Sequence, residues 1–306
     1  MGQVILIPGP VRTIIGTLHD AGHEAYVVGG CVRDALLKRK PQDWDITTDA
    51  EPETVRKLFQ RTVPTGIEHG TVTVLLGKTG YEVTTYRVDG VYEDARHPKD
   101  VTFTKRLTED LKRRDFTINA MAYNGEDGLV DLFDGMRDLE QKTVRCVGNA
   151  HERFSEDALR MMRAYRFAAQ LGFDVEDKTA QAARALADTL QKISAERIRD
   201  ELMKIICSAH PERMLDLYEA GLTRQFLPEF DRCMATEQNN PYHIYNVGEH
   251  TVKAMCAIRE EPVLRLTMLL HDIAKPDGKT TDEKGVDHFY NHAAASREMA
   301  GRILRR

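Results

Sequence analysis

The chain has 306 residues, of which 42% are hydrophobic, and this predicts a soluble globular protein of two or three domains. Its apolar runs are far shorter than the ~20 residues of a membrane span, and its N-terminus lacks a basic leader. Its five scattered cysteines form no CxxC pair. We therefore expect a cytoplasmic protein without disulfides. The formal net charge of −5 places any nucleic-acid contact on local basic stretches, of which 105–114 and 160–166 are the candidates.

Short β-rich runs alternate with helical ones between residues 22 and 148. The expected strands are 23–29 and 44–48, and the expected helices are 31–39 and 51–60, with Pro52 near the first turn of the second helix. The runs 70–77 and 81–87 predict a hairpin, because only KTG separates them. The sequence therefore predicts an α+β head domain with a mixed sheet over residues 1–148.

Strand signals almost vanish after residue 149, and helical patterns replace them. The expected helices are 151–172, 177–191, 194–208, 211–220 and 246–260. This pattern predicts an all-α neck and body at 149–230 and a further all-α domain at 231–306. The final stretch, EMAGRILRR, still reads as a helix without a stop signal, so we expect the chain to be cut inside that last domain.

The stretch VGGCVRD, residues 28–34, lies at the turn between the first expected strand and its helix. Paired glycines let a backbone approach a ligand closely, and the start of a helix attracts an anion, so Gly30 is a candidate phosphate contact. Most such turns bind nothing. Arg33 strengthens the phosphate interpretation, because a guanidinium fixed beside Asp34 can hold two phosphate oxygens at once.

Asp43 and Asp45 lie at the start of a predicted strand, where alternation sends both carboxylates to one face. Two carboxylates next to a phosphate-binding turn suit Mg²⁺, which also takes water and substrate phosphates as ligands. The alternative is that Asp43 caps a turn and Asp45 is a surface charge. Glu82 on the hairpin either adds a third carboxylate or pairs with a charge on the neighbouring strand. Arg114 either reaches a triphosphate or only precedes the apolar run 116–123, which is expected to be helical.

Seven stretches occur in the order seen in the tRNA nucleotidyltransferase and poly(A) polymerase family, the bacterial class II branch of the polymerase-beta-like nucleotidyltransferases. They are VGGCVRD, DWDITTDAEP, HGTVTV, YEVTTYR, LKRRDFTINAMAY, LVDLFDGMRDL and EDALRMMRAYRFAAQLGF. The resemblance is nearest to CCA-adding enzymes and extends over about residues 10–230. It implies a polymerase-beta-like head that adds C, C and A to the 3′ end of tRNA from CTP and ATP without a template and releases pyrophosphate. Bacterial poly(A) polymerases are the competing interpretation.

The resemblance also implies a role for each candidate residue. Asp43 and Asp45 match the ligands of two Mg²⁺ ions, and Glu82 is a further catalytic candidate. The nucleotide-binding positions are matched by Gly30, Arg33, Arg114, Asp157, Arg160, Arg163 and Arg166. Asp157 and Arg160 would read the base edge, and spacing by three residues places Asp157, Arg160 and Arg163 on one face of the expected helix. Without the resemblance, such a helix is more simply an ion-paired surface helix.

Residues 89–103, DGVYEDARHPKDVTF, are long, charged and without periodicity, and they predict a mobile loop. In related enzymes the corresponding loop is needed to switch from CTP to ATP. Its presence favours addition of CCA over addition of CC alone.

Two C-terminal stretches, 240–255 and 264–276, resemble the HD superfamily, in which histidines and a His-Asp doublet bind a divalent metal for phosphate-ester hydrolysis. The matching residues are His250, His271 and Asp272, with His292 as a further candidate and His243 as a competitor for the first position. Imidazole and carboxylate ligands together suit a transition metal. Two functions of other classes stay open for the whole chain: a metal-dependent phosphohydrolase, in which this segment is the working part and the head is vestigial, and an RNA-binding protein that keeps the fold without activity. The sequence predicts no oligomeric state.

Overall fold

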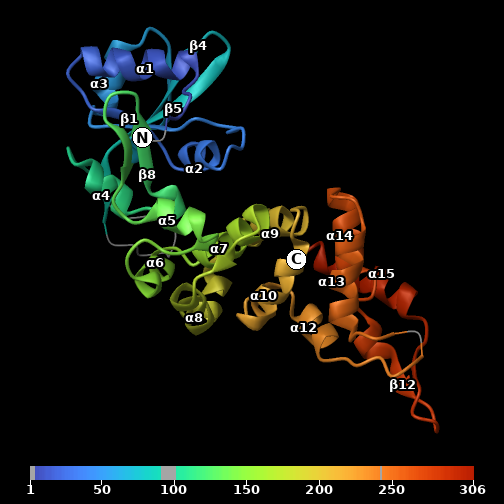
Figure 1. The fold of residues 1–306 in the computed structure, drawn as a ribbon. Helices are drawn as coiled ribbons and strands as arrows, with labels where there is room; N and C mark the ends of the chain where they lie inside the picture. The colour runs from blue at the N-terminus through green and yellow to red at the C-terminus, as the bar shows by residue number, and fades with distance from the viewer. Residues whose placement is uncertain (1–3, 91–100, 242) are drawn as a thin grey trace. The chain divides into compact units, whose positions relative to one another are not determined.

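The structure, a computed structural model, describes residues 4–90, 101–241 and 243–306. It divides into two compact units, Met1–Glu156 and Asp157–Arg306 (Figure 1). None of the helices in the described ranges is both long enough and apolar enough to cross a membrane.

A mixed seven-stranded sheet forms the centre of the first unit, in the order β3-β4-β5-β2-β1-β8-β9. Its strands are β1 (Ala25–Val28), β2 (Ile46–Thr48), β3 (Thr62–Gly66), β4 (Thr71–Leu76), β5 (Thr79–Thr85), β8 (Met121–Asn124) and β9 (Gly128–Asp131). The β2 and β5 strands are parallel, whereas the other neighbours are antiparallel. The predicted α+β class with a mixed sheet is therefore confirmed.

Six helices accompany this sheet in the described part of the first unit, and the first three of them along the chain pack against its strands. They are α1 (Gly9–Asp20), α2 (Gly30–Leu36), α3 (Pro52–Leu58), α4 (Leu107–Lys112), α5 (Gly135–Glu140) and α6 (Ala150–Glu156). The α1 helix buries one apolar stripe, Val11, Ile14, Ile15 and Leu18, whose spacing fits the period of a helix. It lies beside α3, which starts at Pro52, where the missing N–H of proline costs nothing (Figure 1).

The predicted hairpin is present, and its turn is shorter than expected. Leu76 pairs with Thr79, so only Gly77 and Lys78 form the turn, and the rest of KTG belongs to β5. The ends of the predicted mobile loop pair as β6 (Arg87–Asp89) and β7 (Val101–Phe103). The loop prediction itself falls on 91–100, which lies outside the described residues.

The predicted helix over 116–123 is wrong. A short 3₁₀ turn, Thr117–Asn119, leads into β8, which pairs with β1 on one side and β9 on the other. All four residues of β8 are buried. A strand that is covered on both faces reads as a continuous apolar run, and periodicity cannot distinguish such a run from a buried helix.

The second unit is built mainly of helices. They are α7 (Leu159–Leu171), α8 (Asp177–Leu186), α9 (Ala195–Ile206), α10 (Met214–Glu219), α11 (Thr223–Phe226), α12 (Pro228–Met234), α13 (Val247–Ala257), α14 (Pro262–Leu270) and α15 (His292–Ile303). A small antiparallel pair, β12 (Lys279–Thr281) and β13 (Asp287–Phe289), precedes α15. Ile206, Met214 and Phe230 share one apolar core with Val252 and Leu269. Helices on both sides of the predicted 230/231 boundary therefore pack together, and the functional division there stays a prediction.

The helix expected over 151–172 is broken at Asp157. The Asp157 Oδ1 atom accepts a hydrogen bond from the backbone N–H of Leu159 at 3.0 Å, and its carbonyl oxygen accepts one from Arg160 at 2.9 Å. An aspartate that bonds to nearby backbone in this way competes with the helical hydrogen bonds. The expectation that Asp157 shares a helix face with Arg160 and Arg163 is thus wrong, because Asp157 lies at the turn before α7.

Candidate functional site

The Gly29–Gly30 turn at the start of α2 is shaped around an arginine. Gly29 has a φ of +82°, a backbone angle that residues with a side chain rarely adopt. A Cβ atom at this position would lie 3.1 Å from Nη1 of Arg114. Gly30 opens α2, and its Cβ position would lie 3.6 Å from Nη2 of Arg33, an ordinary contact. Glycine at position 29 therefore lets the Arg114 guanidinium lie against the backbone, and both arginines border the turn.

Arg33 is held rigidly in this position. Its Nε donates to Oδ1 of Asp34 at 2.9 Å, and its Nη1 donates to Oδ1 of Asn119 at 2.7 Å. Asn119 in turn donates from Nδ2 to Asp115 at 3.3 Å. The largely buried guanidinium thus ties α2 to the segment that follows α4.

Arg113 and Arg114 are anchored on one buried carboxylate. Asp110 is fully buried and accepts from Nε and Nη2 of Arg113 at 3.0 and 2.8 Å, and from Nη2 of Arg114 at 3.3 Å. Thr47 of β2 adds a hydroxyl at 3.2 Å. Burial alone would raise the pKa of Asp110, but the two guanidinium groups more than offset it, and the pKa lies below its ordinary value. An ionised Asp110 therefore orients Arg114.

The predicted metal carboxylates gather at one end of β2. The strand begins only at Ile46, so Asp43 and Asp45 lie just before it, although Val28 still donates to the carbonyl of Asp45 at 3.0 Å. Because Ile46 pairs with Val83 in the parallel register, the residue before it neighbours Glu82. Asp43 and Glu82 thus both lie close enough to Asp45 to act on its charge, and all three residues are exposed, although in the described part of the chain their oxygens do not form a group of three within 4.8 Å of one another.

The charges around Asp45 are unbalanced. Desolvation by the surrounding protein raises its pKa even though part of the side chain reaches solvent, and the carboxylates of Glu82 and Asp43 add to the rise. Arg114 opposes the rise. Excess negative charge on exposed oxygen donors fits Mg²⁺, because this ion keeps waters and takes phosphate oxygens rather than requiring a complete protein cage. The donor set at this end of β2 therefore fits the expected cofactor.

The predicted base-reading residues lie around α7 and are braced by α9. Arg197 of α9 pairs with Asp157, with 2.9 Å between Nη2 and Oδ2. Arg166 pairs with the buried Glu201 of α9, with 2.6 Å between Nε and Oε2, and its guanidinium lies over the Phe167 ring at 3.9 Å from the centroid.

Spacing along α7 explains how these arginines are arranged. Arg160, Arg163 and Arg166 follow one another at intervals of three residues on this helix, so they share a side of it, and each is half-buried. Arg166 is thus engaged within the unit, whereas the roles of Asp157, Arg160 and Arg163 toward a base stay predictions.

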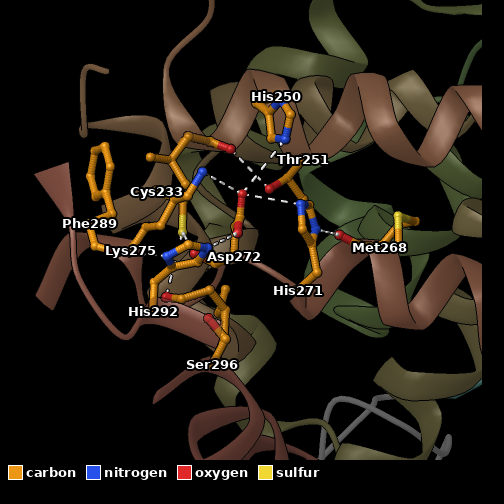
Figure 2. A network of polar contacts seen from close by, with 12 residues as sticks. Cys233, His250, Thr251, Met268, His271, Asp272, Lys275, Phe289, His292 and Ser296 are labelled. Atoms are coloured by element: carbon orange, nitrogen blue, oxygen red, sulfur yellow. Dashed lines mark hydrogen bonds and ion pairs between the residues drawn. The ribbon is translucent and has the colours of Figure 1, made fainter. Parts of the chain in front are cut away.

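A second cluster surrounds Asp272, just after α14. Figure 2 shows rings from three helical segments directed at this one carboxylate: His271 beside it, His250 of α13, and His292 at the start of α15. Their Nε2 atoms lie 3.1 and 3.7 Å from Oδ2 and 3.6 Å from Oδ1, respectively. Within the described parts of the chain, His250, His271 and Asp272 form the group of three ligand atoms that all lie within 4.8 Å of one another.

The orientation of two imidazoles is fixed from behind. Nδ1 of His271 lies 2.7 Å from the carbonyl oxygen of Met268, and Nδ1 of His292 lies 2.7 Å from that of Phe289. A carbonyl oxygen only accepts, so each Nδ1 carries a proton, and each ring turns its Nε2 toward Asp272. A ring nitrogen that faces a carboxylate needs a proton or a metal ion between the two atoms. Backbone carbonyls behind ligating histidines are typical of metal sites, so this donor set fits a transition metal.

The same carboxylate already has a cationic neighbour. Nζ of Lys275 lies 2.8 Å from Oδ2 of Asp272. Burial alone would raise the pKa of Asp272, but His271 and Lys275 hold it well below its usual range. Asp272 in turn raises the pKa of His271. His243 stacks edge-on against His250 at 5.3 Å between ring centroids, and it is outside the group of three.

Two protein families match parts of the chain, and neither match includes the Asp272 cluster. Residues 25–145 match the "Poly A polymerase head domain", and residues 172–234 match the "Probable RNA and SrmB- binding site of polymerase A". The CCA-adding enzyme of Lactiplantibacillus plantarum is 55% identical over 223 residues, which are 73% of this chain and 53% of that protein. That of Limosilactobacillus reuteri is 45% identical over 251 residues, 81% of this chain and 62% of that protein.

The chain belongs to the poly(A) polymerase and tRNA nucleotidyltransferase family. The predicted family membership is thereby confirmed. A solved structure of the family, the Bacillus stearothermophilus CCA-adding enzyme in complex with CTP, is 29% identical, with a TM-score of 0.66 over 98% of this chain and 83% of that chain. The chain spans little more than half of the L. plantarum relative. Both matched family ranges end before His250.

The sequence alone named most of the polar residues described above but not those that position them. Asp110 and Asn119 orient Arg114 and Arg33 in the head, and Arg197 holds Asp157 in the second unit. Asp110 could have been suspected, because it precedes Arg113 and Arg114 by three and four residues within a helical stretch. Arg197 lies three residues after Ser194, the N-cap of α9, where a capping box would carry Glu or Gln. This departure is the only feature of the sequence that sets Arg197 apart. Asn119 gave no signal.

Proposed function

We propose that the chain is a CCA-adding tRNA nucleotidyltransferase, which extends the 3′ end of tRNA with C, C and A from CTP and ATP and releases pyrophosphate. The observation that carries this proposal is that Asp43, Glu82 and Arg114 all lie close enough to Asp45 to act on its charge, while Gly29 lets Arg114 lie against the Gly29–Gly30 turn. Relatives with 45–55% identity that bear the name CCA-adding enzyme support it. Such an enzyme would work in the cytoplasm, where its tRNA partner is found.

Asp43 and Asp45 would hold two Mg²⁺ ions, with Glu82 at their side. Bound Mg²⁺ would favour the attacking form of the tRNA 3′-hydroxyl and neutralise charge that develops on the α-phosphate. Arg33 and Arg114 would grip the triphosphate. Their partners Asp34, Asn119 and Asp110 already fix both guanidinium groups, so little reorganisation is needed when the nucleotide binds. Phosphoryl transfer depends mainly on such positioning.

Asp157 and Arg160 would select the base. A carboxylate accepts from the exocyclic amino group of cytosine or adenine, and a guanidinium donates to their ring acceptors, whereas guanine and uracil present another pattern. Arg163 and Arg166 would contact the nucleotide from the same helix. The Arg197 ion pair would keep the Asp157 carboxylate in one orientation.

Incubation with Mg²⁺, tRNA lacking its 3′ end and each labelled nucleotide tests the proposal. Incorporation of C, C and A supports it, and A-tailing alone favours a poly(A) polymerase. If no nucleotide is incorporated while tRNA still binds, the chain is a silent RNA-binding protein and the proposal fails. In parallel, Arg160→Ala should relax the choice between CTP, ATP and the other nucleotides, and unchanged selectivity would count against Arg160 as a base reader.

We also propose that His250, His271 and Asp272 bind a divalent transition metal, with His292 close by, for hydrolysis of phosphate esters. The Nε2 atoms that face Asp272, held in place by carbonyl oxygens behind two of the rings, favour this second function. Titration with Co²⁺ should give the visible absorption of a histidine-ligated site, and His271→Ala should remove it. Release of phosphate from p-nitrophenyl phosphate, present with Co²⁺ and absent after His271→Ala, tests the hydrolysis step separately from binding.

A further inference from the structure

Lys275 is buried at the centre of the Asp272 cluster, where its ammonium group has three neighbours. Nζ lies 2.8 Å from Oδ2 of Asp272, closer than any of the three imidazole nitrogens, and 3.0 Å from Oε1 of Gln238. The Phe289 ring lies on another side, with its centroid 5.4 Å from Nζ (Figure 2). Only 5% of the residue is exposed. The ammonium therefore cannot simply turn to solvent, and it engages the oxygen that a metal would need.

We propose that Lys275 is a tethered cation that competes with a divalent metal for Asp272 and thereby sets the metal affinity of the site. The inference rests on the proposed metal site and asks what controls its occupancy. Without metal, the ammonium balances a buried carboxylate that would otherwise be costly. When metal is present, two cations share one carboxylate at a separation of a few ångströms, where repulsion is strong because little water screens it.

Gln238 gives the displaced ammonium a place to remain. Its Oε1 accepts from Nζ independently of Asp272, so Lys275 can give up the carboxylate and keep one hydrogen bond. Metal binding is then weakened but not prevented. Ions that bind imidazole strongly, such as Co²⁺ and Zn²⁺, should overcome the competition, whereas Mg²⁺ should not.

The test compares Co²⁺ binding to three full-length proteins by titration calorimetry and visible absorption: the wild type, Lys275→Met and Lys279→Met. Methionine keeps the buried stem without the charge. Lys279 is the matched control, because its Nζ also lies 2.8 Å from a carboxylate, that of Asp287, and the same substitution there leaves Asp272 untouched. We expect Lys275→Met to bind Co²⁺ at least about tenfold more tightly, and Lys279→Met to bind it like the wild type.

Each of the other possible results overturns either the competition or the metal site itself, or makes a further demand on the proposal. Unchanged or weaker Co²⁺ binding by a folded Lys275→Met protein overturns the competition while leaving the metal site standing. If neither the wild type nor Lys275→Met binds Co²⁺, the metal site itself is refuted and the inference falls with it. If Lys275→Met is unfolded without metal, Co²⁺ must restore its circular dichroism spectrum, because the ion then replaces the lost charge. A variant that stays unfolded at saturating Co²⁺ also overturns the inference.

Discussion

The carboxylate of Asp45 in the head and the carboxylate of the Asp272 cluster are balanced in opposite ways. Asp45 is exposed, has Asp43 and Glu82 as acidic neighbours, and has one opposing guanidinium, that of Arg114. Asp272 is only 3% exposed and is surrounded by an ammonium and three imidazoles. The pKa is raised at Asp45 and strongly lowered at Asp272. The protein thus leaves the first charge for a ligand to neutralise and neutralises the second with its own side chains.

This difference follows from burial. An exposed carboxylate such as Asp45 keeps contact with water even where nearby protein partly desolvates it, so it does not need a partner within the fold. A buried one must have a partner in the folded protein, because an unpaired charge there costs several kcal/mol. Removing the carboxylate of Asp45 should therefore affect activity alone, whereas removing that of Asp272 should affect the fold.

Asp45→Asn gives the largest expected effect. The change keeps the size of the side chain and removes a charge that its neighbours disfavour, so the melting temperature should stay the same or rise slightly. Nucleotide transfer to tRNA should fall by about 10²–10³-fold or more, measured under single-turnover conditions with Mg²⁺. Asp20→Asn, at an exposed position in the same unit, is the control and should keep full activity. Normal transfer by Asp45→Asn would remove Asp45 from the metal assignment.

Asp272→Asn should do the reverse. It leaves the Lys275 ammonium buried with Gln238 as its remaining polar partner, so the free energy of unfolding should fall by about 3 kcal/mol. Urea denaturation of the metal-free protein measures the loss. The double variant Asp272→Asn/Lys275→Met should recover part of it, because the unpaired charge is gone. A double variant that is less stable than the single one would show that the two side chains do not compensate each other.

Asp157 combines features of both cases. It is paired with Arg197 inside the protein, as Asp272 is with Lys275, and it is also a candidate contact for the nucleotide, as Asp45 is for a metal. Arg197→Gln removes that partner, and discrimination of CTP and ATP against UTP and GTP should fall by about tenfold as the carboxylate loses its orientation. Arg199→Gln is the matched control on the same helix, because Arg199 is exposed and pairs only with its neighbour Asp200 in the contacts seen.

A conservative variant separates positioning from stability. Arg197→Lys keeps the charge and should restore part of the selectivity in steady-state measurements of kcat/KM. If Arg197→Gln changes stability but leaves selectivity as in the wild type, the ion pair is structural and Asp157 does not depend on it for reading a base.

Much of the head was predictable because its signals are local. Pro52 marked the start of α3, and alternation marked the β4–β5 hairpin. Two predictions were wrong, the helix over 116–123 and the unbroken helix over 151–172, because the local pattern there is misleading. The β8 strand is buried on both faces and therefore lacks the period of two, and the helical spacing of polar residues runs on across the break at Asp157, where one side chain redirects the backbone.

The candidate site was predictable in its residue types but not in its supports. Carboxylates, arginines and histidines announce their chemistry in the sequence, so Asp43, Arg33 and His271 could be named. The partner of Arg33 is Asn119, 86 residues away, and that of Asp157 is Arg197, 40 residues away. Such pairs arise only when the tertiary fold brings distant segments together, and no spacing rule finds them.

Asp287, at the β12–β13 pair, is another buried carboxylate that the protein pairs with its own lysine. It offers the smallest expected effect and the most selective test. It is buried and its pKa is lowered to about 2, first by the hydrogen bond from Lys279, with further hydrogen bonds from the Asn239 backbone and from Thr281. Because the folded state favours the ionised form, this stabilisation is complete above about pH 4 and is lost as the pH falls toward 2.

Asp287→Asn should therefore melt about 2–4 °C below the wild type at pH 6, and the gap should close between pH 4 and pH 2. Calorimetric melting of both proteins across this range measures it. Glu283→Gln, at an exposed position in the turn of the same hairpin, should show no such gap. If the difference in melting temperature persists unchanged at pH 2, Asp287 stabilises the protein through its shape and neutral hydrogen bonds. The Lys279 ammonium is then not what makes this buried carboxylate tolerable.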